Sequence, residues 1–509
     1  MPLVDSFRKR YFYKAAANGI AVIANVITQS IIPRALGAVW YGNFYFLTDS
    51  FTQVMSFLNM NSSIAFYTKL SKRPDERKLV PFYFLFIVAA VLVAFVGVAL
   101  IIYAVLAGRV WLHIPLCFVY AACGLAGITW LFNSVNDIAD AHALTVNAEI
   151  AKVLQRLIGL GLIAVLFFMH WLNMSNIFQV QYVLTLMGLL FLIIILDRAD
   201  RGFQEMGINF KDIKVYLREF YQYSKPLIWR TFVVSILVIF DRWFLQREAG
   251  GAQQGFYTLS FKVEVLCFVL AGAMTQLIMR EFSIAHQNND LGRMGHLFRR
   301  NIPLMYGLTT IICCFVAVNA DKVALIMGGH EFKGLAASLP VMIMAFYPMH
   351  QTYGQLSNVV FFATDQTKIY ATITMASMII GLPFTYFLIA SPLHHGLGAG
   401  AVGLAVKMVS LSIVTNNVLL WFNTRYLKLS FPWFVWHQLI CFAVFFGIAF
   451  LVTYTSDHWF MAQAHIICKI MVSSTVYLTF IGLVIYIYPV LFGIDRVILR
   501  NIFIKGKVL

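Results

Sequence analysis

Long apolar segments recur along the whole chain, and they constrain its fold more than any other feature. A helix needs roughly 20 apolar residues to cross the hydrocarbon core of a bilayer, and about fourteen segments meet that requirement. Hydrophobic residues make up 61% of the chain and charged residues 12%, so the exposed surface needs lipid as its solvent. The sequence therefore predicts an all-α polytopic membrane protein with about 14 transmembrane helices. The predicted spans are residues 15–36, 42–68, 79–107, 111–136, 148–169, 177–196, 226–245, 256–279, 302–320, 334–362, 370–390, 399–422, 434–454 and 466–490.

The distribution of Lys and Arg between these spans predicts the orientation. A net charge of +16 would favour a nucleic-acid partner in a soluble protein, but in a membrane protein cations gather in cytoplasmic loops. An even number of spans with both termini in the cytoplasm is consistent with that rule, and it leaves no role for nucleic acid. The cation-rich segments are FRKRYFYK, KLSKRPDERK, NTRYLKL and DRVILRNIFIKGK, and the cation-poor ones include HWLNMSN and SPLHHG.

A short motif, Arg-x-x-Gly-x-x-x-x-Gly, occurs at residues 34–42 and again at 247–255, an offset of 213 residues. Each copy lies between two apolar segments, at the first predicted outside loop of each half. This position favours two pseudo-symmetric six-helix lobes related by an axis along the membrane normal, followed by two further helices. The alternative is coincidence, because glycine is a common residue. The predicted domains are residues 1–200 for the N-terminal lobe, 201–225 for a cytoplasmic linker, 226–425 for the C-terminal lobe and 426–509 for two additional helices and a tail.

Polar side chains inside the predicted spans are candidates for a functional site, because a charge facing lipid costs several kcal/mol. In the first span Asn18, Asn25 and Gln29 share one helix face, and Asp49 and Gln53 lie in the second. Arginines near span ends could instead extend to the headgroups, and amides could simply hold helices together. We expect the remaining polar groups to line a water-filled chamber between the lobes. The charged candidates are Arg34, Arg230, Asp241, Arg242, Lys262, Glu264 and Lys407.

The balance of charge among these residues indicates the kind of cargo. The cations outnumber the acids, which suits an anion such as phosphate or pyrophosphate and argues against organic cations. A carboxylate desolvated inside a membrane can bind and release a proton near neutral pH. Asp49, Asp241 and Glu264 are therefore the predicted ion-coupling residues.

Motifs for catalysis or metal binding are absent from the sequence. It contains no Gly-x-x-x-x-Gly-Lys-Ser/Thr phosphate-binding loop and no His-Glu-x-x-His metal motif. We therefore expect a protein that is not an enzyme and has no cofactor and no bound metal. The competing interpretation is a membrane glycosyltransferase or polymerase, which would need an acidic outside loop near Asp321, Glu331 or Asp457.

Three stretches carry a family resemblance: PRALGAVWYGNFYF, FDRWFLQREAGGAQQGFYTLSFK and HHGLGAGAVGLAVK. They resemble the polysaccharide transporter family of the multidrug/oligosaccharidyl-lipid/polysaccharide exporter superfamily. The resemblance implies a flippase that works by alternating access in the bacterial cytoplasmic (inner) membrane. Its implied cargo is an undecaprenyl-pyrophosphate-linked oligosaccharide repeat unit, moved to the outer leaflet for O-antigen (lipopolysaccharide), capsule or exopolysaccharide synthesis.

This resemblance gives each group of candidate residues a role. The cations would bind the pyrophosphate, and the amides would donate hydrogen bonds to the sugar hydroxyls. The implied partners are the lipid-linked oligosaccharide, the bilayer, and a polysaccharide polymerase with its chain-length regulator. Two alternatives from the same superfamily remain open: a cation-coupled multidrug exporter and a lipid II flippase. The implied anion-binding residues are Arg34, Arg230, Arg242, Lys262 and Lys407, and the implied sugar-binding residues are Asn18, Asn25, Gln29 and Gln53.

Overall fold

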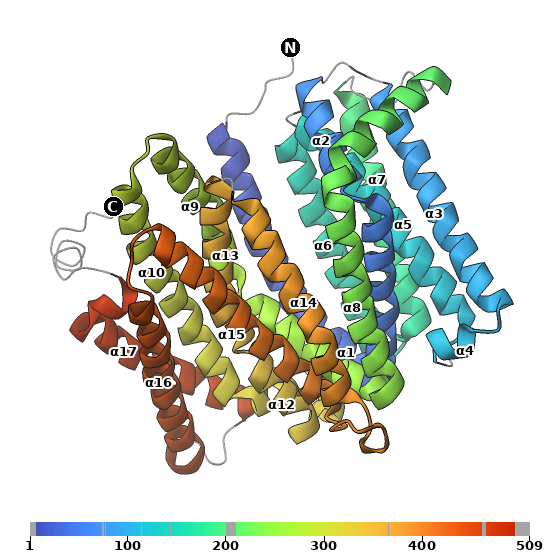
Figure 1. The fold of residues 1–509 in the computed structure, drawn as a ribbon. Helices are drawn as coiled ribbons and strands as arrows, with labels where there is room; N and C mark the ends of the chain where they lie inside the picture. The colour runs from blue at the N-terminus through green and yellow to red at the C-terminus, as the bar shows by residue number, and fades with distance from the viewer. Residues whose placement is uncertain are drawn as a thin grey trace. The chain divides into compact units, whose positions relative to one another are not determined.

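The regular structure of the chain is helical throughout the residues that the computed structural model describes (Figure 1). These are residues 7–73, 76, 78–112, 114–142, 144–199, 210–364, 366–460 and 465–493. Ten of the described helices are long and apolar enough to cross a membrane. The predicted all-α polytopic fold is confirmed. These ten helices overlap eleven of the predicted spans, since Gly19–Asn59 overlaps two of them in one kinked helix. The predicted spans 226–245, 256–279 and 334–362 have no counterpart among the ten described helices.

The chain divides into two compact units, Met1–Gly255 and Phe256–Leu509. This division follows packing, whereas the predicted domain limits follow the sequence repeat and remain a prediction. The helices of the first unit are α1 (Phe7–Asn59), α2 (Ser62–Lys72), α3 (Leu79–Tyr103), α4 (Ala107–Val110), α5 (Leu116–Ala141), α6 (Thr145–Phe168), α7 (Met174–Arg198) and most of α8 (Phe210–Cys267). Those of the second unit are the end of α8, α9 (Val269–Gln287), α10 (Leu291–Val318), α11 (Ala320–Gly328), α12 (Leu335–Met344), α13 (Tyr347–Ala363), α14 (Thr367–Ile389), α15 (Gly400–Tyr426), α16 (Phe431–Thr455) and α17 (Ile466–Ile487).

Helix α1 folds back on itself at Gly37. This residue has φ 70° and ψ 171°, a backbone conformation that only glycine adopts readily. The amide nitrogen of Gln29 donates a hydrogen bond of 2.9 Å to the Tyr45 hydroxyl, although the two residues are 16 positions apart. In a straight helix they would be separated by about 24 Å. At the position of the predicted first outside loop, the chain therefore reverses its direction at a single residue, Gly37.

Helix α8 breaks in the same way at Gly250, which has φ 81° and ψ 176°. Gly37 and Gly250 are equivalent positions of the repeated motif, and their backbone angles differ by about 10° or less. The motif thus has the same local structure in both copies. Its first glycine is required by the backbone conformation, since a Cβ at that position would be strained in either copy.

The beginning of α8 packs within the first unit through charged and polar contacts. Lys69 forms an ion pair with Glu219, and Lys78 Nζ lies 3.1 Å from Asp212 Oδ2. The Tyr216 hydroxyl donates a hydrogen bond of 2.8 Å to Glu76. Burial, together with the Glu76 carboxylate, raises the pKa of the Tyr216 phenol, which therefore stays protonated and keeps donating. Acidic residues of α8 are in this way paired with cations that flank α2 and α3.

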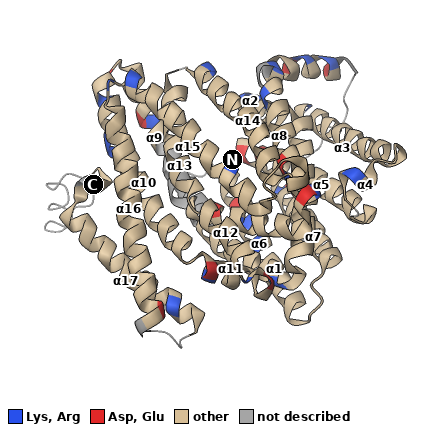
Figure 2. Ribbon diagram, turned by 60° about the horizontal axis from the view of Figure 1, so that its bottom comes forward, with Lys and Arg blue, Asp and Glu red and all other residues tan. Residues whose placement is uncertain are grey.

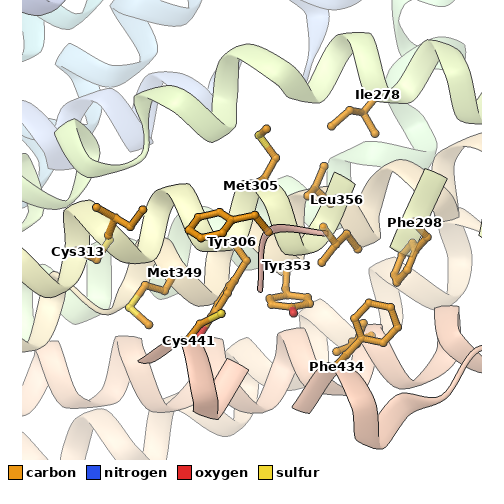
Figure 3. Packing of buried hydrophobic residues seen from close by; sticks show 14 of the residues in the cluster. Ile278, Phe298, Met305, Tyr306, Cys313, Met349, Tyr353, Leu356, Phe434 and Cys441 are labelled. Carbon is orange, nitrogen blue, oxygen red and sulfur yellow. The ribbon is translucent and has the colours of Figure 1, made fainter. Parts of the chain in front are cut away.

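The second unit has a core rich in aromatic and sulfur-containing side chains, contributed chiefly by α10, α13 and α16 (Figure 3). The rings of Tyr306 and Tyr353 lie 4.8 Å apart, and those of Phe298 and Phe434 lie 5.4 Å apart and nearly perpendicular. The Tyr353 hydroxyl lies 3.2 Å from His437 Nδ1, so a polar atom in this core has a partner. Such edge-on aromatic packing fills the space between helices densely.

Charged residues are sparse along the helices of both units (Figure 2). Large apolar side chains are exposed instead, as with Leu92 and Val96 of α3 and Phe387 of α14. Exposed apolar surface of this extent is stable only against lipid. The few charged residues within the long helices are therefore the first candidates for a site.

Candidate functional site

An ion pair inside the first unit joins the second half of α1 to α8. Arg242 Nη2 lies 3.0 Å from Asp49 Oδ2. Arg242 is 7% exposed, and Asp49 is half-buried. Both residues lie within predicted spans, where an uncompensated charge would cost several kcal/mol. The carboxylate and the guanidinium each offset the burial of the other, and the structure brings together two of the predicted site residues that are far apart in sequence.

Two tyrosines extend this ion pair into a polar network along α1. Tyr41, Tyr45 and Asp49 are spaced four apart and so share one helix face. The Tyr41 hydroxyl donates to Gln29 Oε1 at 3.4 Å, and the Gln29 amide nitrogen donates to Tyr45 as described above. Tyr41 is fully buried and Tyr45 is 9% exposed. Neither tyrosine was predicted from the sequence, although their spacing from Asp49 was a signal that could have found them.

A close backbone contact lies beside the network. The amide nitrogen of Gln246 donates to Asn43 Oδ1 at 2.7 Å, which links α8 to α1. A Cβ added at Gly42 would lie 2.6 Å from the Gly255 nitrogen, and one added at Gly255 would lie 3.0 Å from the Ala38 carbonyl carbon. The second glycine of each motif copy therefore allows the two helices to touch through their backbones.

The other predicted residues of the first unit lie around this network or farther along the same helices. Gln53 is half-buried one turn beyond Asp49, and Asn25 is exposed one turn before Gln29. Arg34 is exposed shortly before the reversal at Gly37. On α8, Arg230 and Asp241 are half-buried, and both take part in further interactions. The side chain of Asn18 lies outside the described residues.

The second unit contains the remaining predicted residues, Lys262, Glu264 and Lys407. Lys407 is 7% exposed on α15, and its side chain crosses Gly381 of α14 so closely that a Cβ there would lie 2.9 Å from Lys407 Cε. Glu264 is 5% exposed, lies near the Tyr347 ring, and forms no ion pair or hydrogen bond with a described residue. Lys262 is half-buried. The gathering of the five predicted cations in one chamber remains a prediction.

Helix α15 also carries polar side chains beyond Lys407 in the sequence. Asn416 donates one hydrogen bond of 2.8 Å to the His350 carbonyl and another of 2.9 Å to Ser412 Oγ. Ser377 of α14 is hydrogen-bonded to Thr415. These contacts connect α15 to α13 and α14. These polar side chains were not predicted from the sequence.

Chemically, these arrangements suit binding. Guanidinium and ammonium groups attract anions, and phenols, amides and hydroxyls form hydrogen bonds with sugars or other polar cargo. Among the described residues, no group of three His, Cys, Asp or Glu side chains could hold a metal ion.

Comparison of the whole chain with solved structures identifies its fold. The lipid II flippase MurJ, in an inward closed conformation, superimposes with a TM-score of 0.65 at 13% identity, over 92% of this chain and 98% of that one. A multidrug resistance MATE-family transporter in an inward-facing conformation gives 0.58 at 15% identity, over 80% and 94%. A transporter from Pyrococcus furiosus with a reversed polarity of the binding pocket gives 0.51 at 14% identity, over 83% and 96%. The chain therefore shares its fold with MurJ and with two transporters of the MOP superfamily.

No protein-family model matches the sequence, and no curated protein matches it either. At such low identities the structural likeness shows the fold alone. The similar structures are transporters and a flippase.

Proposed function

We propose that this chain is a flippase that moves an undecaprenyl-pyrophosphate-linked oligosaccharide repeat unit from the inner to the outer leaflet of a bacterial inner membrane by alternating access. Its product would serve O-antigen, capsule or exopolysaccharide synthesis. The observation that carries this proposal is the buried Arg242, held at membrane depth by Asp49 next to a set of neutral hydrogen-bonding side chains. An anionic headgroup with attached sugars needs both kinds of group.

The pairing of Arg242 with Asp49 offers a way to couple cargo to an ion. While Asp49 is ionised, its carboxylate is paired with the Arg242 guanidinium and competes with any incoming phosphate for it. Protonation of Asp49 removes that competitor and leaves Arg242 available to the headgroup. Release of the proton restores the ion pair and expels the anion.

Glu264 is the second coupling residue in this proposal. It is buried, and no ion pair or hydrogen bond joins its carboxylate to a described residue. Such a carboxylate changes its protonation state easily when water reaches it. Asp241, which is half-buried, is the third candidate.

The remaining residues would hold the cargo. Arg34, Arg230, Lys262 and Lys407 would share the pyrophosphate charge. The amides Asn18, Asn25, Gln29 and Gln53, joined by Tyr41 and Tyr45, would bind sugar hydroxyls. The chain has no phosphate-binding loop for ATP, so the energy would come from an ion gradient, the membrane potential or consumption of the product. Both termini would lie in the cytoplasm, and a polymerase with its chain-length regulator would take over the product.

A lipid II flippase is the second candidate, because the MurJ structure covers nearly the whole chain with a TM-score of 0.65. Lipid II is also an anionic lipid-linked saccharide, so the same cations would serve. A multidrug exporter is the less favoured alternative, since it would need a chamber in which acids outnumber cations.

Deletion of the gene in the source bacterium separates these three functions. We expect loss of surface polysaccharide and accumulation of lipid-linked repeat units in the inner leaflet, with restoration by the wild-type gene and not by Arg242→Gln at equal protein level. Arrest of peptidoglycan synthesis and lysis would instead identify a lipid II flippase. Unchanged polysaccharide with increased sensitivity to cationic drugs would identify an exporter.

A further inference from the structure

Helix α6 carries a charged stripe that none of the proposed roles uses. Glu149, Lys152 and Arg156 are spaced three and four residues apart and therefore lie on one face of the helix. Lys152 Nζ lies 2.6 Å from Glu149 Oε1, so these two charges neutralise each other. No ion pair or hydrogen bond joins the Arg156 side chain to a described residue. The stripe therefore has one uncompensated positive charge.

The depth of Arg156 is unusual for an arginine in a membrane helix. Helix α6 comprises 24 residues, Thr145–Phe168, and Arg156 lies at its middle. At 1.5 Å per residue, roughly 17 Å of helix lies on either side, so the residue is close to the midplane of a core that is about 30 Å thick. An arginine near a helix end can reach the headgroups, but one at the midplane has to face water or a partner.

The direction of Arg156 excludes lipid as its environment. The exposed apolar residues of α6 mark its lipid-facing side, and at 100° per residue Arg156 points about 160° away from their mean direction. Arg156 instead shares a side with Gly159 and Ile163, which are buried. The exposed residues that define the lipid side are Ile150, Leu154, Leu157, Ile158, Leu162, Val165 and Phe168.

The neighbours of the stripe keep it in place. The Gln155 amide nitrogen donates to the Leu184 carbonyl of α7 at 2.7 Å, and a Cβ at Gly188 would lie 2.7 Å from that same amide group. These contacts fix the rotation of α6 on α7. Helix α6 also packs along α1, which carries the predicted sugar-binding amides. The side chain of Arg156 is half-buried, so it is partly accessible.

We propose that Arg156 forms an anion-binding subsite on α6 that takes a phosphate or pyrophosphate group at the middle of the membrane. A guanidinium binds such oxyanions with two parallel hydrogen bonds, which an ammonium cannot do. The inference rests on the proposed function, because it assumes an anionic cargo. It adds a contact at mid-depth, in a unit whose predicted cations lie on α1 and α8.

A binding measurement tests the subsite. Purified full-length protein is titrated with farnesyl pyrophosphate, with farnesol as the uncharged comparison and inorganic pyrophosphate as the anion without a lipid tail. A hydrogen bond to a charged group contributes about 1.5–3 kcal/mol, so Arg156→Gln should weaken farnesyl pyrophosphate binding about 10- to 100-fold. Arg156→Lys should retain some of the affinity. Equal affinity for inorganic pyrophosphate and farnesyl pyrophosphate would show that the subsite binds free anions as well as lipid-linked ones.

Gly161→Ala is the matched control, since it changes an exposed residue in open space on the same helix. It alters neither the charged stripe nor the contacts with α7, so we expect unchanged affinity and no loss of melting temperature. Equal affinity in wild type and Arg156→Gln would refute the subsite and leave the proposed function standing. Failure of the wild type to bind farnesyl pyrophosphate at all would refute the proposed function itself.

Chemical rescue tests whether water reaches the subsite. Arg156→Cys should lose affinity, and 2-aminoethyl methanethiosulfonate, a water-soluble reagent, should restore a positive charge there and recover binding. The exposed native thiols of Cys117 and Cys468 also react, so the wild type treated with the same reagent is the reference. If the treated Arg156→Cys variant gains no more affinity than the treated wild type, the proposal of a water-accessible anion site is overturned.

Discussion

Gly42 packs directly against the backbone of Gly255, at a distance that leaves no room for a side chain on either residue. The two glycines occupy equivalent positions in the two copies of one motif, and each lies a few residues after a glycine whose positive φ breaks the helix. The repeat therefore encodes two things in each copy: a point where the helix turns, and a surface where the two copies meet.

We predict that Gly42→Ala destabilises the protein by about 1–3 kcal/mol, because the new methyl group would overlap the α8 backbone, which cannot move aside as a side chain would. Gly97→Ala is the control. Gly97 has open space around it, so the same change should be neutral or stabilising by up to about 1 kcal/mol. Thermal unfolding in detergent measures both variants, and equal melting temperatures for the two would contradict the backbone contact.

Alanine at Gly37 or Gly250 should also be destabilising, for a different reason. Gly250 has open space where a Cβ would lie. At both positions, φ near +75° with an extended ψ is a conformation that costs other residues about 1–3 kcal/mol. Because the two positions are equivalent, we expect similar losses at each. Gly161→Ala, in open space on α6, provides the comparison. A loss at one glycine alone would mean that the two breaks are not equivalent.

A double-mutant cycle on Asp49 and Arg242 should show strong coupling. Removal of either partner leaves the other as an uncompensated charge, so Asp49→Asn and Arg242→Gln should each destabilise the protein more than the double variant does. The expected interaction energy is about 0.5–3 kcal/mol. In binding, Asp49→Asn should raise the affinity for farnesyl pyrophosphate, and Arg242→Gln should lower it. Additive effects would show that the ion pair contributes nothing to stability.

Glu264→Gln should separate transport from the proton gradient. The substitution keeps the shape of a buried side chain that has no described partner, so protein abundance should not fall. If Glu264 carries the proton, cargo movement in vesicles should no longer respond to an imposed pH difference. Glu281→Gln, which changes an exposed residue paired with Arg293, should leave that response intact. An unaltered response in Glu264→Gln would remove the residue from the coupling mechanism.

The features of this fold that could be predicted follow from the absence of water inside a bilayer. Apolar segments that are long enough to cross a bilayer have to become helices there, because no water is present to satisfy the backbone. The all-α polytopic class was therefore predictable, although three of the predicted spans, 226–245, 256–279 and 334–362, have no counterpart among the ten described helices long and apolar enough to cross a membrane. The equivalence of Gly37 and Gly250 was predictable as well, because a backbone position with positive φ is usually occupied by glycine.

Contacts between distant residues were less accessible to sequence reasoning. Asp49 and Arg242 were each predicted as charges at membrane depth. The acidic residue next to Arg242 in the sequence is Asp241, whereas in the fold Arg242 forms an ion pair with Asp49. Tyr41 and Tyr45 resemble ordinary interfacial aromatics until α1 folds back and brings Gln29 to them. Arg156 was present in a predicted span and was overlooked, although its depth could have been counted from the ends of that span.

The single-residue reversal at Gly37 has a practical consequence for mapping the topology. There is no loop between the two halves of α1 into which an epitope tag or a protease site could be inserted, since added residues would push apart helices that are already in contact. Reporter insertions belong instead between α14 and α15, where His394 and Leu397 are exposed and the chain already leaves the helical conformation.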